Sequence, residues 1–438
     1  MTIGLAVRSL LALLLGVGVA LIGLTQAAIL PPPALATALT QQGQNGNGAF
    51  YHIYIPPAES SPMPGQTQTP GQTLGPGRRH QPIPSRQAIE PSPDVSQLSR
   101  VPGYIFYTTP KHNLYFVTGQ HPRKQYTNDG TTVAPALSVD GAQLAWVKFK
   151  RNYSDIYVTS LGYDKGKGSI IPMTTTWMTM TDESPPPALQ LPGCQTPPDY
   201  QPSYGWWAMK PSFLPDGQHL VYLTNRPGFC GLPPASPPDY ADNGVFEQGV
   251  TDTMTNAVRL ISPTLGTGGD DSPGWRPRDP AVFIYTNYYH DNVVNEAIIQ
   301  AAMAVTGTAP TDNDIIGLTP HGATAELPAW SPDGRYIAFV DDHNDAKRSD
   351  VKVMPFHRPG FLADYYHAQT VARGAPYVTQ PFWSPRGDYL GYLTSSGGEF
   401  TLVIRHVKPR GATLEFGPPI PITQAQTADA GYRPAWGP

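Results

Sequence analysis

Two cysteines lie in two proline-rich stretches in the middle of the chain. Cys194 falls within residues 174–210 and Cys230 within residues 225–256, and the sequence has no other cysteine. In an exported protein, two thiols on neighbouring loops are expected to form a disulfide. The sequence therefore predicts a Cys194–Cys230 disulfide that joins the two stretches. The alternative is a pair of separately buried thiols.

Aromatic residues crowd the same region. The candidates for a binding surface are Trp177, Tyr200, Tyr204, Trp206, Trp207 and Tyr240. Rigid aromatic side chains offer a large contact area at a low entropy cost, which suits recognition of a protein or a glycan. A hydrophobic cap that packs on the underlying sheets is the alternative interpretation.

Two histidines complete the set of candidate binding residues. His290 follows two tyrosines, and His343 lies within the acidic run of residues 341–345. Oxygen ligands of this kind can hold a cation, but the run lacks the glycine and terminal glutamate of an EF-hand loop. A solvated acidic loop is the simpler interpretation, so no metal site is predicted.

Motifs for catalysis are absent from the sequence. It contains no G-x-S-x-G nucleophile elbow, no H-E-x-x-H pair, no phosphate-binding Walker loop and no Cys/His zinc spacing. We therefore expect a protein that is not an enzyme and has no cofactor.

A short sequence motif occurs six times and predicts the strands that must position these residues. Its copies begin at Pro135, Pro211, Pro273, Pro328, Pro381 and Pro434. Each has a bulky apolar residue two positions on, and the first five continue through a turn into a second apolar run. The last four copies are spaced by 53 to 55 residues. Short strands and turns at such a period predict the blades of a β-propeller.

A third strand is expected after the first two strands of each blade. Third strands are predicted at residues 155–158, 258–261, 297–301, 350–353 and 401–404. The copy at Pro434 supplies only a first strand, whereas residues 104–107 and 114–117 resemble a second and a third. Pairing of the two ends would complete this blade and remove two open sheet edges. We therefore predict an all-β, six-bladed propeller over residues 101–438, closed by its N- and C-terminal strands.

One copy carries a family resemblance. Pro-Ala-Trp-Ser-Pro-Asp-Gly-Arg-Tyr-Ile-Ala-Phe at residues 328–339 resembles the WD40-like (PD40) repeat of TolB-type six-bladed propellers. Leu318-Thr319 and Ile422-Thr423 fit the Leu-Thr that often precedes the next blade in that family. The resemblance covers residues 101–438 and implies the fold. It stops there, because residues 31–100 are too rich in Pro, Gln, Ser and Gly to form the α/β domain of TolB.

The N-terminal segments indicate the compartment. Residues 1–30 contain Arg8 followed by a long apolar run, which is typical of a secretory signal peptide or an uncleaved membrane anchor. Residues 31–100 form a predicted linker without sustained periodicity. The net charge of -4 gives no basic field for nucleic acid. We expect an extracytoplasmic protein: periplasmic, secreted, or anchored at the cell surface.

Propeller topology places the two long insertions on one face. Connections from the fourth strand to the next blade, and from the second strand to the third, emerge together; we call this side the long-loop face. It would carry the insertions at 174–210 and 225–256. The predicted function is a protein-binding or scaffold module of the cell envelope that uses this face. The alternatives are a glycan lyase or hydrolase with an axial site near His290 and His343, and a structural subunit of a surface assembly.

Overall fold

The computed structural model describes most of the chain from Val101 onward. The described residues are 101–119, 123–150, 154–164, 169–179, 207–224, 244–252, 257–261, 270–279, 281–290, 295–303, 310–311, 314–342, 348–357, 362–374, 377–395, 400–411, 413–423 and 428–438. They belong to the second of two compact units, Gly48–Pro438. The predicted N-terminal apolar segment and linker lie outside the described residues.

Six sheets make up the described structure. Blade one contains β4 (Thr132–Leu137), β5 (Gln143–Phe149), β6 (Ser154–Asp164) and β7 (Ser169–Trp177). Blade two contains β8 (Ala208–Phe213), β9 (His219–Thr224), β10 (Gly244–Gly249) and β11 (Val258–Ile261). Blade three contains β12 (Asp270–Trp275), β13 (Val282–His290), β14 (Asn295–Met303) and β15 (Ile315–Gly317).

The remaining three blades follow the same plan. Blade four contains β16 (Ala325–Trp330), β17 (Tyr336–Asp341), β18 (Asp350–Pro355) and β19 (Gln369–Arg373). Blade five contains β20 (Tyr377–Trp383), β21 (Tyr389–Ser395), β22 (Phe400–Arg410), β23 (Thr413–Phe416) and β24 (Ile420–Pro421). Blade six contains β25 (Ala435–Gly437), β1 (Tyr104–Thr108), β2 (Leu114–Thr118) and β3 (Lys124–Gln125).

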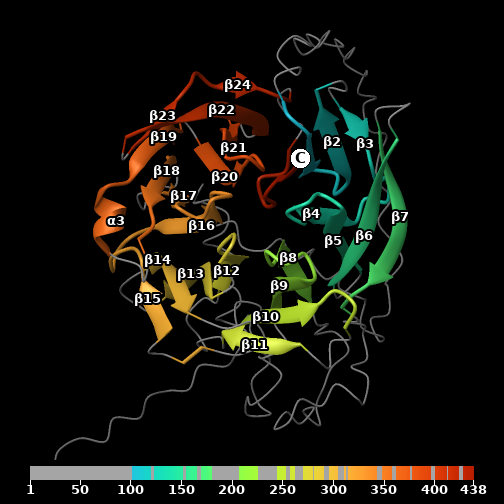
Figure 1. Cartoon of the computed structure of the whole chain (residues 1–438), viewed down its shortest axis with the longest axis horizontal. Helices are drawn as coiled ribbons and strands as arrows, with labels where there is room; N and C mark the ends of the chain where they lie inside the picture. The colour runs from blue at the N-terminus through green and yellow to red at the C-terminus, as the bar shows by residue number, and fades with distance from the viewer. Residues whose placement is uncertain are drawn as a thin grey trace, which may run out of the picture. The chain divides into compact units, whose positions relative to one another are not determined.

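The strands that begin each blade surround a common axis (Figure 1). Each sheet is antiparallel and runs outward from this inner strand in chain order, with β25 taking the inner place in blade six. Ile105 on β1 pairs with Trp436 on β25, and the Trp436 indole donates a 2.8 Å hydrogen bond to the Pro102 carbonyl. The two ends of the described region therefore close the ring, and the predicted six-bladed propeller is confirmed.

The prediction for the third strand of blade two was wrong. β10 pairs with β9, and β11 pairs with β10, so residues 258–261 form the fourth strand. Glu247 and Gln248 are buried in β10. Because these two residues are polar, the segment lacks the apolar alternation by which a strand is predicted from sequence. The predicted insertion at 225–256 therefore contains a strand, and the connection from β9 to β10 spans residues 225–243. The other four predicted third strands coincide with β6, β14, β18 and β22.

The repeated tryptophans join neighbouring blades. Trp330 donates to the Gly274 carbonyl of the preceding blade at 3.0 Å, and Trp383 donates to the Ala329 carbonyl at 3.2 Å. The indole rings also pack in the apolar clusters of the blades. Trp330 and Trp383 therefore each contribute apolar packing and one directional contact to the preceding blade.

The Leu-Thr dipeptides have a structural role. The Thr319 hydroxyl accepts a 3.0 Å hydrogen bond from the Ile299 amide, and the Thr423 hydroxyl accepts one of 2.9 Å from the Leu402 amide. Both amides belong to third strands, and both threonines are buried. The hydroxyl satisfies a backbone donor that would otherwise be buried without a partner. The dipeptide thus completes the outer part of a blade.

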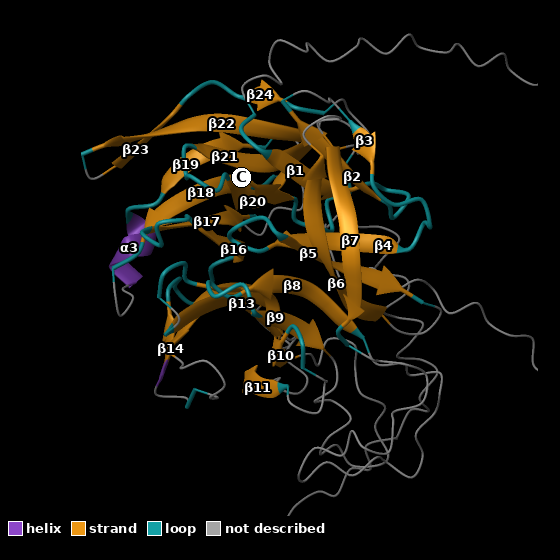
Figure 2. Ribbon diagram, turned by 45° about the vertical axis from the view of Figure 1, so that its right-hand side comes forward, coloured by secondary structure: helices purple, strands orange, loops and turns teal. Residues whose placement is uncertain are grey.

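Helix contributes little to the described part of the chain. α3 (Leu362–Tyr366) has five residues and lies between β18 and β19 at the rim of blade four (Figure 2). No helix among the described residues combines the length and the apolar character that crossing a bilayer requires.

Candidate functional site

Charged side chains from four blades meet near the axis of the propeller. Three of them lie one or two positions before the repeated proline of their blade: Lys210 on β8, Asp271 on β12 and Glu326 on β16. Arg433 holds the same position before β25. Tyr288 joins them from β13. We call these five residues the axial cluster.

A bulge shapes every inner strand of blades one to five at this position. The residue before the proline has a left-handed backbone, with φ between 48° and 54°, and the strand pairing shifts register there. The Leu327 amide donates to the Thr286 hydroxyl of the preceding blade at 3.0 Å. Ala134 makes the same contact with Thr108 at 3.1 Å. Where such a hydroxyl is present, it stabilises a conformation that a non-glycine residue rarely adopts.

Lys210 and Asp271 form an ion pair between blades two and three. The Lys210 ammonium lies 2.5 Å from a carboxylate oxygen of Asp271, and the two side chains are only 15% and 8% exposed. Asp271 also accepts a hydrogen bond from the Ser272 hydroxyl. A pair this far from solvent holds both charges in fixed positions.

Tyr288 and Glu326 link blades three and four. The Tyr288 hydroxyl donates to a Glu326 carboxylate oxygen at 2.7 Å. Burial raises the pKa of Glu326 to about 7, against the opposing effect of this hydrogen bond. Burial also raises the pKa of Tyr288, so its hydroxyl keeps its proton. Near neutral pH, Glu326 is therefore a carboxyl group that can take up or release a proton.

Arg433 reaches from blade six to blade four. Its guanidinium donates to the Leu327 carbonyl at 2.8 Å, so it passes the inner strand of blade five. Burial lowers the pKa of Arg433 to about 10, and the nearby charge of Asp271 opposes that shift. The side chain remains a cation at neutral pH. The cluster therefore brings two cations and two carboxyl groups into a small volume.

A further carboxyl lies beside the axial cluster. Asp270 accepts a 3.0 Å hydrogen bond from the Asn287 amide. Burial raises the pKa of Asp270 to about 7, the charge of Asp271 adds to the shift, and the Asn287 contact opposes it. Two acids with a pKa of about 7, Asp270 and Glu326, thus feel the charge of Asp271. Among the described residues, no group of three His, Cys, Asp or Glu side chains is placed to hold a metal ion.

The axial cluster lies toward the long-loop face. Glu326 is the second residue of β16, and Tyr288 is near the end of β13. Inner strands begin, and second strands end, at the same face, where β9 ends and β10 begins. The cluster therefore lies at the centre of the face that the sequence marks for binding.

The structure places three of the eight predicted binding residues. Trp207 is 4% exposed and belongs to an apolar core cluster with Ala208 and Phe246, which is the position expected of a packing residue. Trp177 ends β7 opposite Tyr157. His290 ends β13, at the long-loop end of blade three. The predictions for Tyr200, Tyr204, Trp206, Tyr240, His343 and the Cys194–Cys230 disulfide lie outside the described residues.

Sequence reasoning missed the axial cluster, although a signal was present. At the position before the proline, the repeats differ from one another, with Ala134, Lys210, Ser272, Leu327, Gln380 and Arg433 in turn. A repeat held together by packing alone would place similar residues there. Lys210 and Arg433 at this position, with Asp271 and Glu326 one position earlier in their repeats, are the signal of a charged cluster.

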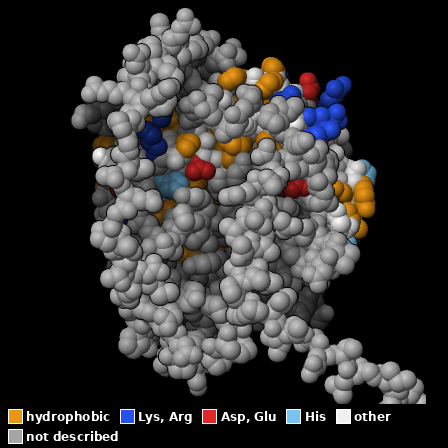
Figure 3. All heavy atoms as spheres, turned by 180° about the vertical axis from the view of Figure 1, so that it is seen from behind, with side chains coloured by type: hydrophobic (Ala, Val, Ile, Leu, Met, Phe, Trp, Pro, Cys, Tyr) orange, Lys and Arg blue, Asp and Glu red, His pale blue; other side chains and the backbone are white. Residues whose placement is uncertain are grey.

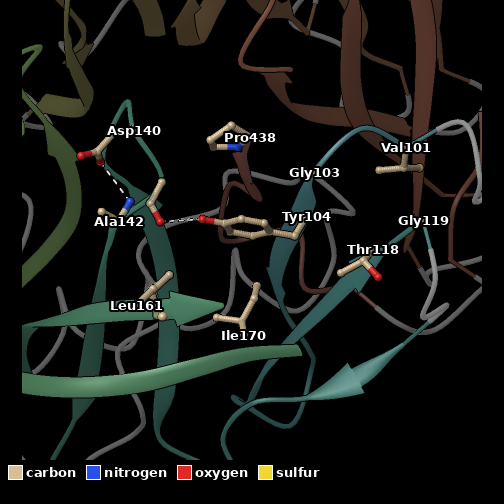
Figure 4. A pocket seen from close by; sticks show the side chains of 12 residues that line it. Val101, Gly103, Tyr104, Thr118, Gly119, Asp140, Ala142, Leu161, Ile170 and Pro438 are labelled. Atoms are coloured by element: carbon tan, nitrogen blue, oxygen red, sulfur yellow. Dashed lines mark hydrogen bonds between the residues drawn. The ribbon is translucent and has the colours of Figure 1, made fainter. Parts of the chain in front are cut away.

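A cavity of about 600 Å³ opens between blades six and one (Figure 4). Tyr104, Leu161 and Ile170 line it, and the Tyr104 hydroxyl donates to the Gly141 carbonyl at 2.6 Å. Asp140 and Gly141 belong to the turn between the first two strands of blade one. The cavity therefore lies at the end of the propeller opposite the axial cluster.

The class of protein is thus an all-β, six-bladed propeller with a charged axis. No protein-family model matches the chain, so the PD40 assignment of the repeat is not confirmed, and no curated protein matches it. TolB proteins are among the solved structures that it resembles in fold. TolB from Acinetobacter baumannii is 18% identical with a TM-score of 0.46, covering 77% of this chain and 67% of its own.

Two other solved structures are similar at the same level. A putative TolB from Agrobacterium tumefaciens is 14% identical with a TM-score of 0.40, covering 72% of this chain and 88% of its own. An oligogalacturonate lyase in complex with manganese is 11% identical with a TM-score of 0.39, covering 67% and 68%. At these identities the likeness concerns the fold alone.

Proposed function

We propose that this chain is a non-enzymatic, extracytoplasmic binding module of the cell envelope that receives a protein partner on its long-loop face. The observation that carries the proposal is the axial cluster, which concentrates fixed charges at the centre of that face. Groups that already hold one another need little reordering when a partner binds, so less of the contact energy is lost. The surrounding loops would then supply contact area.

Binding fits this arrangement better than catalysis. Lys210 is held by Asp271 at 2.5 Å, and Tyr288 donates to Glu326 at 2.7 Å. A nucleophile or a general base must be able to reach a substrate atom, whereas these groups are engaged with one another. Mutual pairing is the state expected of polar anchors at the centre of an interface.

The compartment is part of the same proposal. The apolar run in residues 1–30 is typical of export or of membrane anchoring, and the chain has only two cysteines. A propeller of this kind outside the cytoplasm would meet partners of the cell envelope.

The test is a pull-down from native envelope extract with the full chain as bait. One variant combines Trp206→Ala with Tyr240→Ala, and leaves Trp207 unchanged because that side chain is core. A second combines Tyr288→Phe with Glu326→Gln, which keeps the shape of the pair. Arg386→Gln is the control, because Arg386 is exposed in a turn at the opposite face, beside Asp388.

A partner retained by the wild type and the control, but lost by either of the other variants, would support the proposal. Capture of the same partner by all four proteins would place its binding elsewhere. Failure of the wild type to retain any partner would contradict the proposed function.

One observation favours a second candidate function. Glu326 has a pKa of about 7, so a substrate that displaced its contact with Tyr288 could lose a proton to it at neutral pH. Arg433 could hold an anionic sugar in exchange for its contact with the Leu327 carbonyl. A lyase acting on acidic glycans would use this pair. Incubation with oligogalacturonate, followed by ultraviolet absorbance of the unsaturated product, tests the idea. Activity in the wild type that disappears in Glu326→Gln would support it, and no product from the wild type would reject it.

A further inference from the structure

Blades four and five carry added structure at the connection from the third strand to the fourth. In blade four this connection contains α3. In blade five, β22 runs on beyond the blade, and its residues 407–410 pair with β23 as a hairpin. β24 then takes the place of the fourth strand against Val403 and Ile404. Connections of this type emerge on the face opposite the long-loop face.

Hydrogen bonds join the two additions into one surface. The Gln369 side chain donates to the Leu414 carbonyl at 3.2 Å and accepts from the Leu414 amide at 2.9 Å. Arg405 also donates to the Val371 carbonyl on β19. We call residues 362–369, 407–411 and 413–416 together the rim surface. Its two halves come from different blades, so no single repeat accounts for it.

The rim surface exposes apolar side chains on one side of α3. Leu362 is 42% exposed and Tyr366 is 68% exposed. Residues four apart lie on the same face of a helix, so both point outward together. The acidic residue between them, Asp364, is buried and is held by His357 at 2.8 Å. The outer face of the helix therefore presents a leucine and a tyrosine, with the carboxylate directed inward.

Cations lie on the other half of the rim surface. Lys408 and Arg410 are exposed near the end of the hairpin, where Lys408 pairs across the strands with Glu415 and Arg410 with Thr413. On the α3 side of the molecule, hydrophobic and histidine side chains gather at the margin, and above them lies a basic group with an acidic group beside it (Figure 3). The surface therefore combines apolar groups with two exposed cations and one exposed acid, Glu415, and its exposed groups keep an excess of one positive charge within a protein of net charge -4.

We propose that the rim surface docks on an anionic lipid bilayer, with Leu362 and Tyr366 in the interfacial layer and Lys408 and Arg410 against lipid phosphates. Leucine inserts among acyl chains, tyrosine favours the headgroup level, and each Lys or Arg adds electrostatic attraction to an anionic surface. The combination of the two kinds of side chain is what an interfacial contact requires.

A bilayer suits the shape of this surface better than an acidic peptide does. α3 and the hairpin both stand at the outer margin of the propeller (Figure 2). A peptide is usually held in a groove or added to a sheet edge. Exposed apolar groups that project beside cations can instead meet a flat surface without a groove.

The test compares full-length proteins on two kinds of vesicle, pure phosphatidylcholine and a mixture with phosphatidylserine at about 30 percent. The apolar segment of residues 1–30 is the same in every variant, so differences report on the folded surface. Lys408→Gln with Arg410→Gln should lower the preference for anionic vesicles about fivefold per charge removed. Leu362→Ser with Tyr366→Ser should weaken binding to those vesicles about tenfold.

The control variants remove a cation or an apolar side chain of the same kind at positions outside the rim surface. Lys111→Gln removes an exposed cation at the long-loop face, and Val139→Ser removes an apolar side chain that is 66% exposed in the first turn of blade one. Neither should change the preference. Amide hydrogen exchange of residues 407–416 should slow on anionic vesicles in the wild type, and not in the Lys408/Arg410 variant.

Three results would overturn the proposal. The first is an equal preference for anionic vesicles in the wild type and the Lys408/Arg410 variant. The second is the same loss of preference in the Lys111 control, which would indicate a general charge effect. The third is slower exchange of residues 407–416 with a glutamate-rich peptide but not with vesicles, which would assign the surface to an acidic protein.

Discussion

Tyr288 and Glu326 meet across the boundary between blades three and four, and a 2.7 Å hydrogen bond joins the tyrosine hydroxyl to the carboxylate. The two residues lie 38 positions apart in the chain. Because the pKa of Glu326 is about 7, this carboxyl gains or loses a proton near neutral pH at the boundary between the two blades. The stability of the ring should therefore depend on pH through this pair.

The Glu326→Gln substitution tests that dependence. The pKa of Glu326 is raised in the folded state, so folding favours the protonated form, and the wild type should lose stability as pH rises from about 4.5 to 7. Glutamine keeps an acceptor for Tyr288 without the charge. The variant should match the wild type near pH 4 and exceed its free energy of unfolding by about 3 kcal/mol at pH 8.

Denaturant unfolding of both proteins across this pH range supplies the measurement. Glu415→Gln, at an exposed position, is the control and should show no such divergence. A wild type that gains stability relative to Glu326→Gln as pH rises from 5 to 8 would contradict the assignment.

Removal of the Lys210 charge should be costly. Lys210→Met leaves the carboxylate of Asp271 buried without its cation, and breaking a buried pair in this way costs about 3 to 5 kcal/mol. The double variant Lys210→Met with Asp271→Leu should recover part of the loss, because neither charge of the pair remains, while Arg433 loses the nearby charge of Asp271. Urea midpoints of the single and double variants measure this coupling. Equal midpoints for Lys210→Met and the wild type would show that the pair does not stabilise the ring.

Trp436→Phe should loosen the closure of the ring. Phenylalanine keeps most of the packing but loses the donor to the Pro102 carbonyl, which costs about 1 kcal/mol. Trp383→Phe is the comparison, because it removes the hydrogen bond from Trp383 to the Ala329 carbonyl between blades five and four, away from the point of ring closure. Amide exchange in β1 should quicken in the first variant and not in the second. Equal exchange in β1 for both variants would indicate that closure is no weaker than the other blade contacts.

Thr319→Val should destabilise the propeller by about 1 to 2 kcal/mol. Valine has nearly the same shape but leaves the buried Ile299 amide without its acceptor. Thr174→Val on the exposed strand β7 is the control, and should change stability by less than about 0.5 kcal/mol. Thermal or urea unfolding compares the two variants. A similar effect at both positions would remove the structural role given to the Leu-Thr dipeptide.

The propeller architecture can be predicted from the sequence alone because the same repeat occurs six times. The copies of the repeat at Pro328 and Pro381 each contain the end of one strand, a turn and a second strand. A period of about 50 residues leaves few alternatives to a propeller. Ring closure follows as well, since the Pro434 copy and residues 104–107 each lack what the other supplies. Where the local pattern weakens, the prediction fails, as it does at β10 with its buried Glu247 and Gln248.

The candidate site depends on contacts that no local pattern contains. Lys210 and Asp271 lie 61 residues apart, and Arg433 reaches a carbonyl 106 residues before it. Periodicity shows which residues face into a sheet, but not which side chains of different blades share the space around the axis. Only the closed ring, with a bulge before each proline of blades one to five, brings these charges together. Their mutual burial then sets the pKa values of Glu326 and Arg433.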